Sequence, residues 1–324
     1  MLTKKAQTLR QMPIKKMFNC EELANAEVKK FKEWFKVKYK HDYFNYNDVN
    51  LANAIYEYVS PEIGEKIQLG KESVWLSPKK NVFTTSGPKT LKELLEEKTG
   101  NCVSFTSLFC MLAEELVDEN GKKIVNAHPF FSRIKLNDMP PLDTGHLSVA
   151  VKTADKIIHY DPSQKVSHID YQGEIVPKEE LMVMTLNQLG VMAGNNGNIT
   201  DAIKYFNKAL KITPNSARVL YNKALTFDDF ERFGDAIDIF DQMLKANKSD
   251  IHAWHGKGVV LAKMGNWKDA ITHFHTAINI NESHPLTYYI KNDLKDVNEW
   301  KEKYYEFLSR KKMIEEAKDE RHHY

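Results

Sequence analysis

Cysteine is scarce in this chain, with only Cys20, Cys102 and Cys110 among 324 residues. An odd number of cysteines without paired spacing argues against a disulfide framework and against the usual zinc-binding motifs. The sequence also lacks an apolar run near the roughly 20 residues that a membrane-spanning helix needs, and its first residues lack the apolar core of a signal peptide. These absences predict a cytoplasmic protein without a membrane span, in which each cysteine is a thiol.

A large excess of charge of either sign is also missing, because the formal net charge is +2. This balance argues against a general nucleic-acid binder, and no nucleic acid is expected as a partner. The first twenty residues are locally basic and contain no acid, which predicts a solvated basic arm. Residues 1–44 as a whole are expected to form a basic helical N-terminal extension. The alternative for this patch is a contact with a membrane, a nucleic acid or an acidic partner. Its basic residues are Lys4, Lys5, Arg10, Lys15 and Lys16.

The second half of the chain repeats with a period of 34 residues. Alanine recurs at one position of the period and phenylalanine recurs four places later, which is helical spacing. The aligned positions are Ala202, Ala236 and Ala270, then Phe206, Phe240 and Phe274, then Ala209, Met243 and Ala277. This pattern over residues 183–282 resembles three tetratricopeptide repeats, and residues 283–324 are expected to form a capping helix and a charged tail.

The resemblance implies an all-α solenoid whose first helices line a groove that binds a polypeptide. By the repeat register, the groove positions are Asn187, Arg218, Tyr221, His252 and His255. The carboxylate clamp of some family members is not reproduced, because Val191, His252 and Gly256 occupy its places. The two histidines have no acidic residue or cysteine nearby in the sequence, so groove residues are favoured over a metal site.

Cys102 directly follows the sequence Thr-Gly-Asn and precedes an apolar stripe at helical spacing. With Asn101 as the N-cap, Cys102 falls in the first helical turn, where unpaired N–H groups and the helix dipole favour an anion. A thiol at that position is expected to have a lowered pKa, as a nucleophile requires. The alternative is a buried packing residue, which is also the interpretation of Cys110.

A β-hairpin is predicted downstream, with a turn at Ala154-Asp155. If Thr153 faces Lys156, then Asp161 lies opposite Ser148 and on the same face as His146. A histidine oriented by a carboxylate and facing a thiol is the arrangement that activates cysteine for acyl transfer. His159 is a rival base on the same face, while His128 and His168 are weaker candidates.

These residues resemble the transglutaminase-like family of cysteine enzymes, a branch of the papain-like fold. The shared motifs are Gly100-Asn101-Cys102, then His146 at the start of one strand, then Asp161-Pro162 at the end of the next. The resemblance implies an α+β domain over residues 45–175, in which the cysteine helix packs on an antiparallel sheet.

The function implied is cysteine-dependent acyl transfer on protein or peptide amide bonds without a metal or other cofactor. Cys102 would be the nucleophile, His146 the base and Asp161 its orienting partner. Hydrolysis is favoured, and the alternatives are protein cross-linking and a non-catalytic interaction scaffold. The family also implies a second oxyanion donor, for which Trp75 and Gln68 are the candidates.

Overall fold

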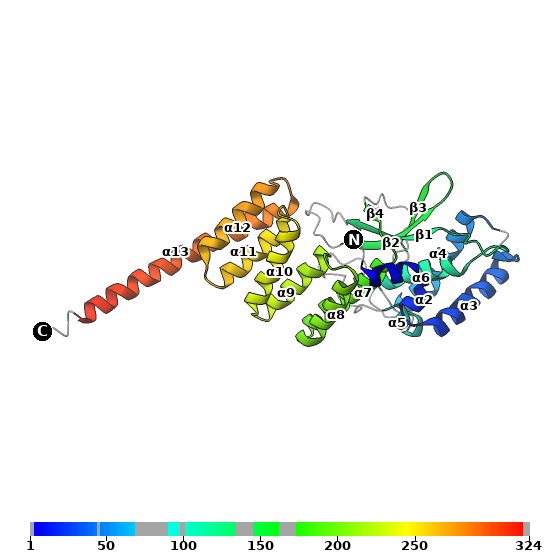
Figure 1. Ribbon diagram of the computed structural model, residues 1–324, viewed down its shortest axis with the longest axis horizontal. Coiled ribbons are helices and arrows are strands. Elements are labelled where there is room, and N and C mark those ends of the chain that lie inside the picture. The colour runs from blue at the N-terminus through cyan, green and yellow to red at the C-terminus, as the bar shows by residue number, and fades with distance from the viewer. Residues whose placement is uncertain are drawn as a thin grey trace. The chain divides into compact units, whose positions relative to one another are not determined.

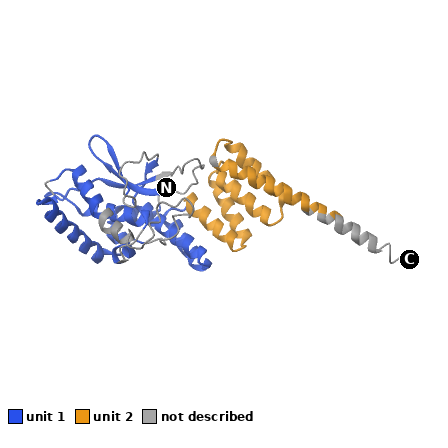
Figure 2. Cartoon of the chain, turned by 180° about the vertical axis from the view of Figure 1, so that it is seen from behind, with its two compact units in different colours: residues 1–214 blue, residues 215–324 orange. Residues whose placement is uncertain are grey.

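The computed structural model describes residues 3–43, 46–68, 90–97, 101–133, 145–161 and 173–319. The chain divides into two compact units, Met1–Pro214 and Asn215–Tyr324, called the first and the second unit below (Figure 2).

The first unit contains helices and one small sheet, whereas the second unit is helical where it is described (Figure 1). The helices of the first unit are α1 Lys4–Gln11, α2 Ile14–Met17, α3 Glu21–Tyr39, α4 Asp48–Gln68, α5 Leu91–Glu97, α6 Cys102–Glu115, α7 Glu179–Asn195 and α8 Ile199–Ile212. Its strands are β1 Ala127–Arg133, β2 Gly145–Lys152, β3 Ile157–Tyr160 and β4 Gly173–Ile175. The second unit contains α9 Ala217–Asp229, α10 Phe233–Ala246, α11 Ile251–Lys263, α12 Trp267–Ile280 and α13 Pro285–Asp319.

The strands form an antiparallel sheet in the order β3-β2-β1-β4. Leu147, Val149 and Val151 are fully buried, as expected for the core face of a strand with alternating side chains. Tyr160 pairs with Val149 and its ring lies 5.5 Å from the Phe109 ring of α6, so this face of the sheet packs on α6 (Figure 1). The predicted packing of a cysteine-bearing helix on an antiparallel sheet is therefore observed.

The N-terminal residues are helical as predicted, but they are not a solvated arm. Their basic side chains lie mostly on the exposed face, while Ala6, Leu9 and Ile14 on the other face are buried. Helix α2 packs against α6, and α1 packs against α7 and α8. The prediction of a solvated arm is wrong, because it rested on the basic composition of the segment. Its packing is set instead by the narrow stripe of apolar residues on the other face.

The 34-residue period corresponds to three helix pairs, α7–α8, α9–α10 and α11–α12. The alanine and phenylalanine positions of the period are buried in every pair, as predicted. Gly190 and Gly258 occupy equivalent places in the first and third pairs. A Cβ atom at either glycine would lie 2.6 Å from the ring of a phenylalanine in the second helix of the pair, Phe206 or Phe274. The small residue therefore allows the two helices of a pair to approach closely.

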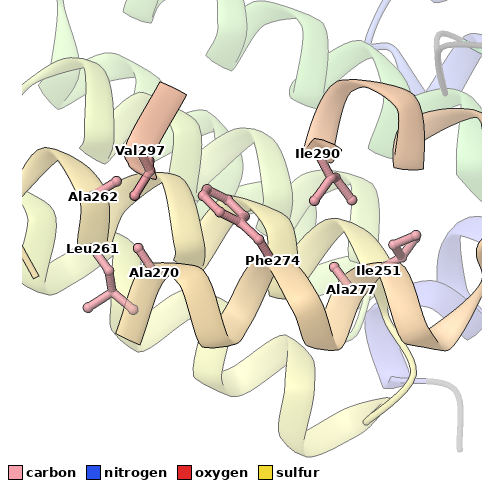
Figure 3. Close-up of a cluster of buried hydrophobic side chains, with 8 residues drawn as sticks. All are labelled: Ile251, Leu261, Ala262, Ala270, Phe274, Ala277, Ile290 and Val297. Atoms are coloured by element: carbon pink, nitrogen blue, oxygen red, sulfur yellow. The ribbon is translucent and has the colours of Figure 1, made fainter. Parts of the chain in front are cut away.

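Helix α13 packs against both helices of the third pair. Ile290 and Val297 of α13 are buried against α11 and α12, with Phe274 at the centre of the cluster (Figure 3). The helix pair α7–α8 belongs to the first unit, so the sheet-containing unit ends at Pro214 and includes the first repeat. None of the helices among the described residues combines the length and the apolar character needed to cross a membrane.

Candidate active site

Cys102 is the first residue of α6, and the cap that precedes it fixes its backbone. The side-chain Oδ1 of Asn101 accepts hydrogen bonds from the N–H groups of Val103 and Ser104, each at 3.1 Å. The Ser104 hydroxyl accepts in return from the Asn101 N–H at 2.9 Å, which completes a capping box. The half-buried Cys102 thus lies at the positive end of the helix, as the sequence predicts.

The β2–β3 hairpin has the predicted register. Val149 pairs with Tyr160 and Ala150 pairs with His159. Extended by one residue beyond β3, this register places Asp161 opposite Ser148. His146 and Asp161 consequently share a face, and Nε2 of His146 lies 2.7 Å from Oδ2 of Asp161. Both side chains are buried, with exposed fractions of 2% and 0%, so this polar pair is shielded from water.

The His146 ring and the backbone N–H of Leu147 are close enough to the Cys102 thiol to act on its pKa. Burial raises the pKa of this thiol, but its interactions with His146 and with the Leu147 N–H outweigh burial and lower the pKa below that of an ordinary cysteine. The three predicted site residues therefore lie together, with His146 bonded to Asp161 and acting on the thiol.

The pKa of His146 is shifted in the opposite direction to that of the Cys102 thiol. Burial lowers its pKa, while hydrogen bonds to Asp161 and Cys102 and the charges of both partners raise it to about 10. A lowered thiol pKa and a raised imidazole pKa favour the thiolate–imidazolium ion pair near neutral pH. That ion pair is the form in which a cysteine acts as a nucleophile.

The competing histidines are in different surroundings. The His159 ring packs against Phe130 with the ring centroids 4.3 Å apart, and burial lowers its pKa. Burial also lowers the pKa of His128, with smaller contributions from Lys152 and Lys123. His146 differs from these two in its 2.7 Å bond to a buried carboxylate and in a pKa that is raised by Asp161 and Cys102. His168 and Trp75 lie outside the described residues, as does the side chain of Gln68.

The other two cysteines are buried and unactivated. Burial raises the pKa of Cys110 far above the usual range. Burial and the charge of Glu21 raise the pKa of Cys20 to about 11. Among the residues that the structure describes, no three histidine, cysteine or acidic side chains form a group that could hold a metal ion.

Gln188 is a neighbour of the site that sequence reasoning missed. Its Oε1 accepts a hydrogen bond from Nδ2 of Asn101 at 2.9 Å, across 87 residues of chain. Gln188 lies on α7, the first helix of the first repeat. No local pattern in the sequence indicates this contact, because it depends on how α7 packs against α6.

The predicted groove residues are distributed over both units. Asn187 is on α7 and is buried, with an exposed fraction of 6%, so it offers little surface to a partner. In the second unit the Tyr221 and His252 rings lie 5.8 Å apart, and the His252 and His284 rings lie 5.6 Å apart. His284 precedes α13 and was not predicted.

The remaining two groove predictions have different surroundings. Arg218, near the start of α9, is partly exposed. His255 is largely buried, and its Nε2 is 2.6 Å from Oδ2 of Asp293 on α13. The acidic partner of His255 therefore comes from Asp293 of α13, which lies 38 residues further along the chain.

Comparison with known proteins identifies the helix pairs. The family model described as tetratricopeptide repeat matches residues 187–251 and 221–285. These residues form tetratricopeptide repeats. The match does not extend into residues 45–165, so the transglutaminase-like resemblance remains a prediction. No curated protein matches the chain.

Solved structures with similarity to the chain include tetratricopeptide repeat domains. The first such domain of Spaghetti (RPAP3), bound to the HSP90 peptide SRMEEVD, is 15% identical, covers 36% of this chain and 91% of its own, and has a TM-score of 0.33. The Arabidopsis OM64 domain is 16% identical, with coverage of 36% and 95% and a TM-score of 0.31. The Sgt2 domain from Aspergillus fumigatus is 18% identical, with coverage of 38% and 82% and a TM-score of 0.34.

Proposed function

We propose that the protein is a cysteine-dependent acyl-transfer enzyme acting on protein or peptide amide bonds, and that its repeats bind a polypeptide. The observation that carries the enzymatic part is the buried His146–Asp161 pair, bonded at 2.7 Å, beside the Cys102 thiol, whose pKa His146 lowers. The opposite pKa shifts of the thiol and the imidazole support a thiolate–imidazolium pair. Such a pair provides both the nucleophile and the acid that amide cleavage requires.

In the proposed reaction, the Cys102 thiolate attacks the carbonyl carbon of the amide, and negative charge moves to the carbonyl oxygen. The Cys102 N–H, which has no acceptor within α6 because it belongs to the first turn, donates a hydrogen bond to that oxygen. The His146 imidazolium protonates the leaving nitrogen, the carbon–nitrogen bond breaks, and a thioester remains on Cys102. Asp161 orients the ring and stabilises its positive charge.

The thioester is then released by water. His146, now neutral, accepts a proton from the attacking water, and the carbon–sulfur bond breaks to give a carboxylic acid and restore the thiolate. Attack by an amine instead of water would cross-link two chains through the same thioester. Hydrolysis and cross-linking therefore share the three site residues and differ in the second nucleophile.

The repeats support the polypeptide-binding part of the proposal. Tyr221, His252 and His284 form a row of rings in the second unit, and such rings can pack on a peptide and donate hydrogen bonds to it. A scaffold that binds a polypeptide without turnover is the second candidate function, because the family match covers the repeats. Such a scaffold would bind its partner through the rings of Tyr221, His252 and His284 and would not need the Cys102 thiol.

Thioester trapping tests the enzymatic part of the proposal. The protein is incubated with a mixed peptide library and hydroxylamine, which converts a thioester to a hydroxamate, and the products are identified by mass spectrometry. We expect hydroxamates with the wild-type protein and with Cys110→Ser, which is the matched control, and none with Cys102→Ser. Equal product from wild type and Cys102→Ser would contradict the assignment. Peptide binding without any hydroxamate would support the scaffold.

A further inference from the structure

Gln188 of the first repeat contacts the residue that caps the cysteine helix. Oδ1 of Asn101 accepts from two N–H groups of α6, so the other end of the amide, Nδ2, must point away from the helix. Nδ2 donates to Oε1 of Gln188 at 2.9 Å. Both sets of bonds are formed in one orientation of the Asn101 side-chain amide. The bond to Gln188 therefore stabilises the orientation in which Oδ1 caps α6.

Helix α7 is itself fixed within the first unit, so Gln188 is held in place. Glu179, in the first turn of α7, is buried and accepts a hydrogen bond from Nε of Arg10 at 2.9 Å. Further along α7, Gly190 lies so close to the Phe206 ring that a Cβ atom there would be 2.6 Å from it. These contacts tie α7 to α1 and to α8.

We propose that Gln188 is a positioning residue for Cys102, so that a helix of the first repeat sets the reactivity of the thiol. This inference rests on the proposed function of Cys102. Without the bond to Gln188, the Asn101 amide can rotate, and the N–H groups of the first turn lose their fixed acceptor. The backbone that carries Cys102 then becomes less ordered, and the thiolate loses part of the stabilisation that the helix start provides.

The test measures the alkylation rate of Cys102 by iodoacetamide as a function of pH in the full chain, with site-resolved mass spectrometry. Gln188→Met keeps the side-chain volume and removes the acceptor. Asn101→Ser breaks the same bond from the other side while keeping a good N-cap residue. Gln242→Met, at an exposed position on α10, is the control.

We expect each of the two site variants to raise the pH midpoint and to slow alkylation at pH 7 by about three- to tenfold. The double variant should shift the midpoint by less than the sum of the two single shifts, because both changes remove one bond. Gln242→Met should match the wild type. If Gln188→Met does not fold, the midpoint of Asn101→Ser decides the outcome.

Two results would overturn the inference. A lower melting temperature with an unchanged pH midpoint in both single variants would make Gln188 a packing residue only. Fully additive shifts in the double variant would separate Gln188 from the Asn101 cap. Failure of the proposed function gives a different result, namely an ordinary cysteine midpoint in the wild-type protein.

Discussion

The repeats and the thiol site are organised by contacts of different range. In the repeats, the two helices of each pair pack against each other, and the same alanine and phenylalanine positions are buried in every pair. In the thiol site, the key bonds join residues that are far apart, and Asn101 and Gln188 are separated by 87 residues. Stability of the repeats is therefore a sum of similar local interfaces, whereas the surroundings of Cys102 are built from single non-local contacts.

The largest expected effect is the loss of His146. His146→Ala should slow acylation of Cys102 by about 10²- to 10⁴-fold, because the base and the partner of the thiolate are lost together. It should also lower the free energy of unfolding by about 3–5 kcal/mol, because Asp161 is left buried without its bonded imidazole. Probe labelling and urea denaturation measure the two effects.

His159→Ala is the matched control for that variant. The His159 ring is half-buried against Phe130, so its removal should reduce stability while labelling of Cys102 continues near the wild-type rate. If labelling depended on His159 and not on His146, the assignment of the base would be wrong.

The next effect concerns pH. The pKa of Cys102 is lowered, so its alkylation rate should rise with pH and level off below the range of a free thiol, whose pKa is about 8.5. The pKa values of Cys20 and Cys110 are raised, so these thiols should react quickly only after unfolding. Site-resolved labelling in native and denaturing buffer measures the alkylation rates of all three cysteines. A midpoint of the Cys102 rate at or above about pH 8.5 would contradict the thiolate–imidazolium pair.

The smallest effects test the repeats. Gly258→Ala should destabilise the protein by about 1–3 kcal/mol, because the added Cβ atom meets the Phe274 ring. Gly234→Ala, on the exposed side of α10 with no atom within 4 Å of the new Cβ, should be neutral or stabilise by up to about 1 kcal/mol. Thermal and urea denaturation measure both. Equal stability of the two variants would show that close approach at Gly258 is unimportant.

Labelling of Cys102 should be unchanged in both glycine variants, since both positions belong to the second unit. A change in the labelling rate would indicate that the reactivity of the thiol depends on the stability of the later repeats.

The sequence by itself determined the elements that depend on local patterns. The 34-residue period determined the helix pairs, because the same alanine and phenylalanine positions are buried in every repeat. The start of α6 was predictable because Asn101 caps it through bonds within four residues. The face of the hairpin was predictable because strict alternation buries Leu147 and Val149 together, and the tight turn at Ala154-Asp155 sets the observed pairing.

Only the tertiary structure decided the features that depend on distant packing. The basic N-terminal segment packs because α6, α7 and α8 offer apolar surface to it, which its own composition does not reveal. Gln188 reaches Asn101, and Asp293 reaches His255, because separate helices pack side by side. A polar side chain selects its partner by geometry rather than by sequence spacing, so such contacts appear only when the chain is folded.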